Sequence, residues 1–108
     1  MTDVDGMIEQ NKNFLIVEWK RHTGPLPTGQ AIAYGRMVRT GPYTLLRLVG
    51  DPKTMIVTHM AAWTRDTSEK QQALRQCNNG DVEVFLMKWD TWACQTDVAR
   101  FPGETLPL

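Results

Sequence analysis

The chain has 108 residues and a mass of 12.3 kDa, which is enough for one folded domain and little more. Hydrophobic residues make up 42% of it and charged residues 22%, so a disordered chain, a collagen and a disulfide-dense miniprotein are excluded. The formal net charge is zero, which argues against a protein that coats nucleic acid by bulk charge. We therefore expect a single domain over residues 1–108.

The ends of the chain and its two cysteines favour a cytoplasmic protein. Residues 1–12 are acidic and polar, whereas a secretory signal needs a basic start and an apolar run of about 7 to 15 residues. The longest apolar stretch, residues 14–17, is far shorter than the ~20 residues of a membrane helix. Cys77 and Cys94 without an export signal indicate free thiols in a reducing compartment. We expect residues 1–12 to form a polar head and residues 102–108, with two prolines and a glycine, to form a tail.

Four runs of β-branched and aromatic residues predict strands in the first half of the chain. The segment HTGPLPTG ends the first run, Thr-Gly-Pro separates the second from the third, and Gly-Asp-Pro-Lys turns the chain into the fourth. Such short connections favour antiparallel neighbours in meander order. The predicted strands cover residues 14–20, 30–39, 43–49 and 54–63.

The pattern changes after the fourth run. Asp66-Thr-Ser-Glu69 resembles a capping box and predicts a helix over residues 67–77, with Asn78-Asn-Gly80 as its C-terminal stop. Residues 82–89 then alternate and predict a fifth strand. The expected fold class is α+β, an antiparallel meander of four strands with one helix packed on the sheet, followed by a fifth strand.

Strand register predicts which side chains form the core. If the turn pairs Arg39 with Tyr43, alternate residues of the hairpin share one face, and the Asp-Pro turn extends that face into the fourth strand. His59 is therefore expected to be mostly buried. The predicted core face carries Ile32, Tyr34, Val38, Thr44, Leu46, Leu48, Met55, Val57, His59, Ala61 and Trp63.

Charge is balanced overall but not locally. Residues 14–65 carry seven basic and two acidic side chains, a net of +5, whereas residues 1–13 carry −2 and residues 66–108 carry −3. Clustered positive charge attracts anions even when the whole molecule is neutral. Guanidinium groups and an aromatic ring on one sheet face can pair phosphates and stack bases. A face that simply meets solvent, or pairs with the acidic half, is the alternative. The candidate anion or nucleotide site comprises Arg39, Tyr43, Arg47, Lys20, Arg21 and Trp19.

The loop after the first strand is a second place where an anion could bind. Lys20-Arg21-His22 opens a segment that contains Gly24, Pro25, Pro27 and Gly29. Such a loop could hold a phosphate or a carboxylate, although it lacks the spacing of a phosphate-binding P-loop. Basic residues are also common at exposed strand ends.

The sequence offers no convincing catalytic or metal site. The only serine, Ser68, falls in the predicted first helical turn, where capping explains it. His22 and His59 with Cys77 and Cys94 match no zinc-ligand spacing. We therefore expect no enzymatic activity, no cofactor and no metal, and a hydrolase or transferase that uses His22 or a cysteine stays an alternative.

Aromatic residues are more numerous than one small helix can cover. Trp, Tyr, Met and Arg are enriched in interface cores, so part of this set is expected to contact a partner or a second copy. The alternative is that the aromatics complete the core of the monomer. The interface candidates are Phe85, Met87, Trp89, Trp92 and Phe101.

These patterns favour a small cytoplasmic binding protein that acts by occupying the surface of a protein partner. Accessory and inhibitory factors of the kind found in phages and plasmids have this character. We also expect self-association into a homo-oligomer and no contact with membranes. A module that binds single-stranded nucleic acid or a small nucleotide through the basic and aromatic sheet face is the main alternative.

Overall fold

The fold is built around one mixed β-sheet. A computed structural model describes residues 6–64 and 74–96 of the chain. The sheet order is β1-β2-β3-β4-β5, and β2 and β3 are parallel while the other neighbours are antiparallel. The elements are β1 (Gly6–Gln10), β2 (Asn13–Lys20), α1 (Thr28–Thr40), β3 (Tyr43–Asp51), β4 (Ile56–Trp63), β5 (Arg75–Gln76) and α2 (Asn79–Gln95).

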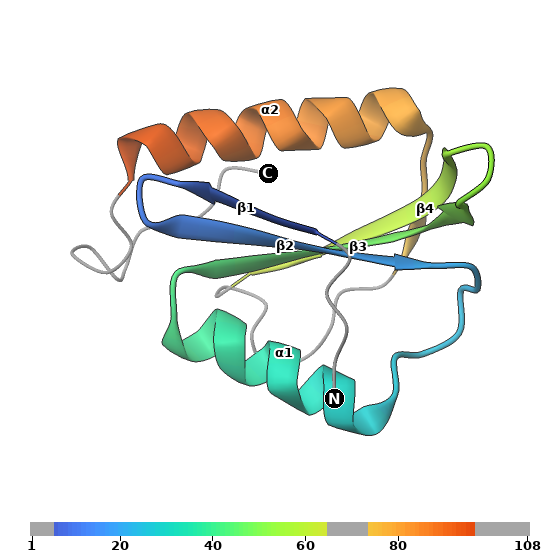
Figure 1. The fold of residues 1–108 in the computed structure, drawn as a ribbon, viewed down its shortest axis with the longest axis horizontal. Coiled ribbons are helices and arrows are strands. Elements are labelled where there is room, and N and C mark those ends of the chain that lie inside the picture. Colours follow the sequence, from blue (N-terminus) through green and yellow to red (C-terminus); the bar gives the residue numbers. More distant parts are fainter. Residues whose placement is uncertain (1–5, 65–73, 97–108) are drawn as a thin grey trace.

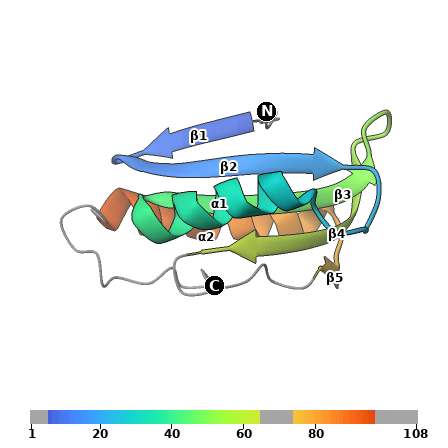
Figure 2. The same ribbon diagram turned by 90° about the horizontal axis from the view of Figure 1, so that it is seen from below.

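The two helices cover opposite faces of the sheet (Figures 1 and 2). Helix α1 connects β2 to β3, because parallel neighbours need a crossover connection rather than a tight turn. Helix α2 follows β5 and lies on the other face. The predicted α+β class is confirmed, but the sheet is mixed and has two helices rather than an antiparallel meander with one.

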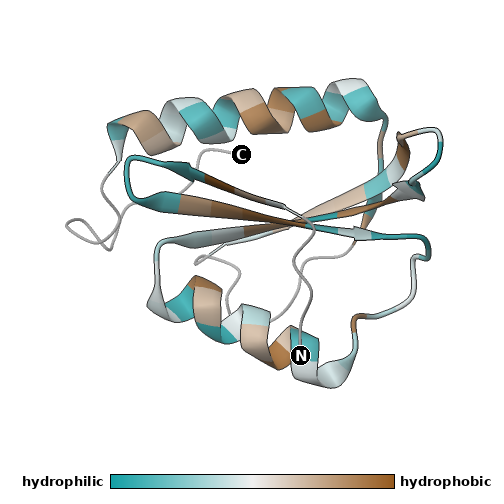
Figure 3. Ribbon diagram, in the orientation of Figure 1, coloured by the Kyte–Doolittle hydropathy of each residue, from teal (hydrophilic) through white to brown (hydrophobic). Residues whose placement is uncertain are grey.

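Each helix closes its own half of the core, and the strands between them are among the most hydrophobic segments (Figure 3). On the α2 side, the helix contributes Val82, Phe85, Trp89 and Ala93 at helical spacing. On the α1 side, Tyr34 and Val38 pack with Leu45 and Trp63 of the sheet. The α2 side of the sheet presents Leu15, Leu46, Leu48, Val57, Met60 and Ala62.

The strand predicted over residues 30–39 is wrong, because this segment forms most of α1. The predicted hairpin about residues 40–42 is therefore a helix-to-strand connection. Ala31, Tyr34 and Val38 lie at helical spacing on the side that faces the sheet, whereas Ile32 is 50% exposed. Alternating apolar residues suggested a strand, but burial follows the helical period.

The strand predicted over residues 82–89 is also wrong, since it lies within α2. Asn78 does not end a helix but begins one. Its side chain accepts a hydrogen bond from the Asp81 backbone N–H at 3.0 Å, and Asp81 Oδ2 accepts one from the Asn78 backbone N–H at 2.9 Å. This reciprocal pair is a capping box, which satisfies two N–H groups at the start of α2.

The strands predicted over residues 14–20, 43–49 and 54–63 are confirmed as β2, β3 and β4. Their predicted register fails at a β-bulge between Val49 and Gly50. Next to the turn, Gly50 pairs with Val57, which agrees with the predicted register. Beyond the bulge, Val49 pairs with His59, so the register is shifted by one residue and the β4 side chains there lie on the opposite face of the sheet from the predicted one.

The bulge corrects the predicted core face. Leu46 and Leu48 share the α2 face with Met60 and Ala62, while Trp63 lies on the α1 face. Exposure corrects three further members of that face: His59 is half-buried, and Ile32 and Met55 are exposed.

Residues 6–10, expected to belong to a polar head, form the edge strand β1. A two-residue turn joins β1 to β2, and both turn residues, Asn11 and Lys12, have positive φ angles of 53° and 67°. This is the geometry of a type I′ turn, whose twist suits a hairpin. Asn13, which follows the turn, is buried and its side chain donates to the Ala93 carbonyl at 3.3 Å, joining the hairpin to the end of α2.

The predicted helix over residues 67–77 falls mainly outside the described residues, and within its described end Arg75 and Gln76 form β5. The predicted tail over residues 102–108 also lies outside them. No helix in the described part of the chain has the length and apolarity needed to cross a membrane.

Candidate functional site

The candidate site lies where β2 and β3, the two parallel strands, end. In open α/β sheets, ligands commonly bind beyond the carboxyl ends of parallel strands, because the loops there and the helix N-terminus converge. A pocket of about 190 Å³ occupies this position, which we call the basic pocket. Its lining consists of Lys20, Arg21, His22, Gly24, Pro25, Leu26, Pro27 and Arg47.

Arg47 is the buried cation of the basic pocket. It lies on the α1 side of β3 and is only 5% exposed. One terminal N–H donates to the carbonyl of Gly24, while the Nε–H finds no acceptor among the described residues. Burial lowers the pKa of the Arg47 guanidinium from its ordinary value, and the nearby Glu18 carboxylate acts against this shift. An anion in the pocket would supply a compensating charge for this buried guanidinium.

Glu18 lies beside Arg47 on the neighbouring strand and is 2% exposed. Its carboxylate accepts hydrogen bonds from the Tyr34 hydroxyl at 2.8 Å and from Gln30 Nε2 at 3.0 Å. The Lys20 ammonium forms an ion pair with it at 2.9 Å. Glu18 therefore anchors α1 to the sheet and offsets part of the positive charge, while Arg21 and Arg47 keep the pocket cationic.

The N-terminus of α1 borders the same pocket through Pro27. No described side chain caps this helix end, and its first turn contains no acidic residue. The first N–H groups of a helix carry partial positive charge and accept anions. In α2, by contrast, Asn78 and Asp81 satisfy that role. The open helix end thus adds to the positive potential created by Arg21 and Arg47.

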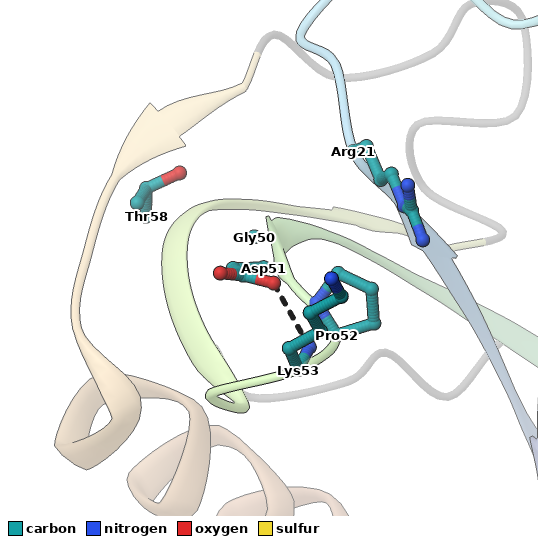
Figure 4. A pocket seen from close by; sticks show the side chains of 6 residues that line it. All are labelled: Arg21, Gly50, Asp51, Pro52, Lys53 and Thr58. Carbon is teal, nitrogen blue, oxygen red and sulfur yellow. Dashed lines mark hydrogen bonds between the residues drawn. The ribbon is translucent and has the colours of Figure 1, made fainter.

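A second pocket adjoins the first at Arg21, which lines both. Figure 4 shows the side chains that line this second pocket. It has a volume of about 460 Å³ and lies between the end of β2 and the turn that joins β3 to β4, so we call it the hairpin pocket. Asp51 Oδ1 accepts a hydrogen bond from the Lys53 backbone N–H at 2.9 Å and shapes this turn. The lining comprises Arg21, Gly50, Asp51, Pro52, Lys53 and Thr58.

The structure divides the predicted anion site into two groups. Lys20, Arg21 and Arg47 meet in the basic pocket. Arg39 and Tyr43 lie near the opposite end of β3, and Tyr43 stacks on Phe14 with ring centroids 5.4 Å apart. Arg47 lies four positions after Tyr43 along β3, which corresponds to roughly 13 Å.

Trp19 lies on the other face of the sheet. It packs against the α2-side core, and its indole N–H donates to the Gly50 carbonyl at 3.1 Å. The indole therefore contacts the backbone beside the hairpin pocket without lining the basic one.

Sequence reasoning missed several polar contributors to this site, among them Glu18, Gln30 and Lys53. A signal existed for Glu18, because a carboxylate within the apolar run FLIVEWK needs a partner if the strand is buried on both faces. Gln30 gave none, since its segment was interpreted as a strand. Lys53 was assigned to the turn, which is correct, but nothing in the sequence placed that turn beside Arg21.

The interface candidates lie in different environments. Phe85 and Trp89 are 5% and 1% exposed and belong to the core beneath α2, and Trp92 is half-buried against it. Met87 is 71% exposed on the outer side of that helix. Phe101 lies outside the described residues.

The residues considered for catalysis lie in several elements, and His59 is the register partner of Gln76, next to Cys77. Cys77 and Cys94 are free thiols, and burial raises the pKa of Cys77 above its ordinary value, with Asp81 adding to the shift and Arg75 opposing it. Over residues 6–64 and 74–96, no cluster of His, Cys, Asp and Glu could hold a metal ion. His22 lines the basic pocket, and Ser68 lies outside the described residues.

The fold and the site define an α+β protein with a cationic pocket at the carboxyl ends of two parallel strands. Comparison with known proteins finds no matching protein family, no matching curated protein and no matching solved structure. Functional inference therefore depends on the chemistry of this pocket.

Proposed function

We propose that the protein is a small binding protein whose basic pocket holds the phosphate group of a ligand. The observation that carries the proposal is the buried Arg47 guanidinium, which lines the pocket and has one carbonyl acceptor among the described residues. Burying a cation costs free energy, and the negative charge of a phosphate group in the pocket would offset part of that cost. The open N-terminus of α1 and the Arg21 side chain support the same class of ligand.

The alternative role for Arg47 is structural, as the counter-ion of Glu18. The two roles differ in their effect on anion binding. A structural arginine stabilises the fold without creating affinity for anions. A substitution at Arg21 tests anion binding without affecting the core, because this side chain is exposed and lines the pocket.

Calorimetric titration with inorganic phosphate tests the proposal. We expect saturable binding that Arg21→Ala weakens by about five- to tenfold, the loss of one charge-assisted hydrogen bond. Arg39→Ala is the matched control, because it removes an exposed arginine near the other end of β3 and should leave the affinity unchanged. Absence of saturable binding, or equal losses in both variants, would contradict the proposal.

A second candidate is the binding of a protein partner or of another copy through the outer side of α2. Met87 and Val84 lie three residues apart on this helix and are 71% and 51% exposed. Large exposed apolar side chains at helical spacing are typical of interaction surfaces. Light scattering should then give a mass above 12.3 kDa that Met87→Lys reduces to the monomer value. A monomer mass across micromolar concentrations would contradict self-association.

A further inference from the structure

The hairpin pocket differs from the basic pocket in size. The hairpin pocket is an open depression of about 460 Å³, whereas the basic pocket, at about 190 Å³, is smaller than the roughly 300–1,000 Å³ of most ligand sites. The smaller pocket therefore suits a head group, and the larger one suits the body of a ligand. Because the exposed Arg21 lines both, the two pockets are neighbours, and a ligand that extends over both would contact this side chain.

The hairpin pocket also differs in chemistry. Its lining includes the Asp51 carboxylate and the Thr58 residue together with the cations Arg21 and Lys53 (Figure 4). A carboxylate repels a second phosphate but accepts hydrogen bonds from hydroxyl groups. Asp51 is exposed, and its Oδ1 already accepts from the Lys53 backbone N–H, so the carboxylate is held in place at the pocket.

Acceptors of this kind are suited to the hydroxyl groups of a sugar. In doubly wound α/β folds that bind dinucleotides, a carboxylate accepts from a ribose hydroxyl while a helix N-terminus holds the pyrophosphate. Here Asp51 ends β3, and the uncapped N-terminus of α1 borders the basic pocket. The same division of roles is therefore available on this sheet.

We infer that the two pockets form one site for a ribose 5-phosphate group, such as a ribonucleoside 5′-monophosphate carries, with the phosphate in the basic pocket and the ribose hydroxyls at Asp51. This inference rests on the proposed phosphate binding and adds the class of ligand. It assigns Asp51 as the residue that distinguishes ribose from deoxyribose, and Arg21 as the cation between the two halves of the site.

A comparison of four probes tests the assignment: inorganic phosphate, ribose 5-phosphate, adenosine 5′-monophosphate and its 2′-deoxy analogue. We expect both ribose compounds to bind more tightly than inorganic phosphate. The deoxy analogue should bind about three- to tenfold more weakly than the ribonucleotide, as expected for one lost hydrogen bond.

Asp51→Asn supplies the decisive variant. The amide oxygen can still accept from the Lys53 backbone N–H, so the turn should keep its shape and the thermal unfolding midpoint its value. We expect this variant to reduce the preference for ribose at least threefold while leaving the affinity for inorganic phosphate nearly unchanged. Glu83→Gln, which alters an exposed carboxylate on α2, should change neither quantity.

The outcomes separate this inference from the proposed function. If inorganic phosphate binds but neither ribose compound binds more tightly, or if Asp51→Asn leaves the ribose preference intact, the nucleotide assignment is wrong and phosphate binding stands. If a single-stranded oligonucleotide binds more tightly in proportion to its length, the ligand is a strand of nucleic acid and the mononucleotide assignment is again wrong. If none of the probes binds, both proposals fail.

Discussion

Glu18 and Arg47 are register partners on the two parallel strands, and both side chains are buried on the face that α1 covers. The Glu18 carboxylate has three described donors, whereas the Arg47 guanidinium has one carbonyl acceptor and an unpaired Nε–H. The acidic partner is thus satisfied within the fold, and the basic partner retains capacity for an anion. This asymmetry is the physical basis of the proposed site.

The hydrogen bond from Tyr34 to Glu18 should contribute measurably to stability. Tyr34→Phe removes the hydroxyl that donates to the buried carboxylate at 2.8 Å. A hydrogen bond to a charged group contributes about 1.5–3 kcal/mol, so we expect the free energy of unfolding to fall by about that amount in urea. Tyr43→Phe, at a half-buried ring that stacks on Phe14, should change it by less than about 0.5 kcal/mol. Equal effects of the two substitutions would argue against the Glu18 anchor.

Binding of a phosphate ligand should depend on ionic strength. Arg21 is exposed, and the pocket as a whole is cationic, so salt should screen the attraction. We expect the calorimetric affinity to fall several-fold between about 0.05 and 0.5 M potassium chloride. Association through Met87 would rest on apolar burial and should weaken little over the same range. Phosphate affinity that is independent of salt would contradict a charged site.

Gly50 should tolerate no side chain. A Cβ atom at this position would lie 2.2 Å from the Ile56 carbonyl oxygen, at the bulge that sets the register of β4. We expect Gly50→Ala to reduce the free energy of unfolding by about 1–3 kcal/mol or more, as overpacking against backbone does. Gly24→Ala is the control, because a Cβ atom there would meet nothing within 4 Å. Thermal unfolding of both variants checks this, and a Gly50→Ala protein as stable as the wild type would refute the bulge geometry.

The two cysteines should differ in reactivity. Cys94 is exposed, whereas Cys77 is half-buried with a raised pKa, caused first by burial and then by Asp81. Since the thiolate is the reactive form, iodoacetamide should alkylate Cys94 first, and the rate at Cys77 should rise only at higher pH than for an ordinary thiol. Because the Cys77 pKa is raised in the folded protein, the folded protein keeps this proton to a higher pH than the unfolded chain does. The contribution of Cys77 to the free energy of unfolding is therefore fully present below the ordinary thiol pKa and is lost as the pH rises above it. Mass spectrometry of peptides labelled across a pH series measures the order, and faster labelling of Cys77 would contradict it.

The two strands on either side of the Asp-Pro turn were predictable. Residues 43–49 and 54–63 carry β-branched and aromatic side chains around an Asp-Pro turn, and they form β3 and β4. The bulge at Gly50 was not predictable from the same pattern, because one unpaired residue leaves the composition of both strands unchanged and still exchanges their faces.

The two helices were missed for a shared reason. Residues 30–39 and 82–89 contain apolar residues at both strand-like and helix-like spacings, and β-branched residues favour the strand interpretation. Tertiary packing decides between the periods, since Tyr34 and Val38 on α1, like Phe85 and Trp89 on α2, face the sheet at helical spacing. The capping pair of Asn78 and Asp81 was a usable local signal for α2, because a side-chain acceptor three residues before an acidic residue marks a helix start.

The candidate site was partly predictable. Lys20, Arg21 and His22 are adjacent in sequence, and their loop was identified as a place for a phosphate. Arg47 was identified as well, but it was grouped with Arg39 and Tyr43 through a hairpin that does not exist. In the structure this segment is α1, and β2 and β3 are parallel neighbours. Their carboxyl ends lie at the same edge of the sheet, so the loop after β2 and Arg47 line one pocket.

The most direct test of the phosphate site is a titration of isotopically labelled protein with inorganic phosphate, followed by amide chemical shifts in NMR spectra. Binding at the basic pocket should shift the amides of residues 20–24, 26, 28 and 47 in a saturable manner and leave those of Arg39 and Tyr43 unchanged. Arg21→Ala should require a higher phosphate concentration for the same shifts. Shifts confined to the Arg39 and Tyr43 end of β3, or none at residues 20–28 up to millimolar phosphate, would contradict the proposed site.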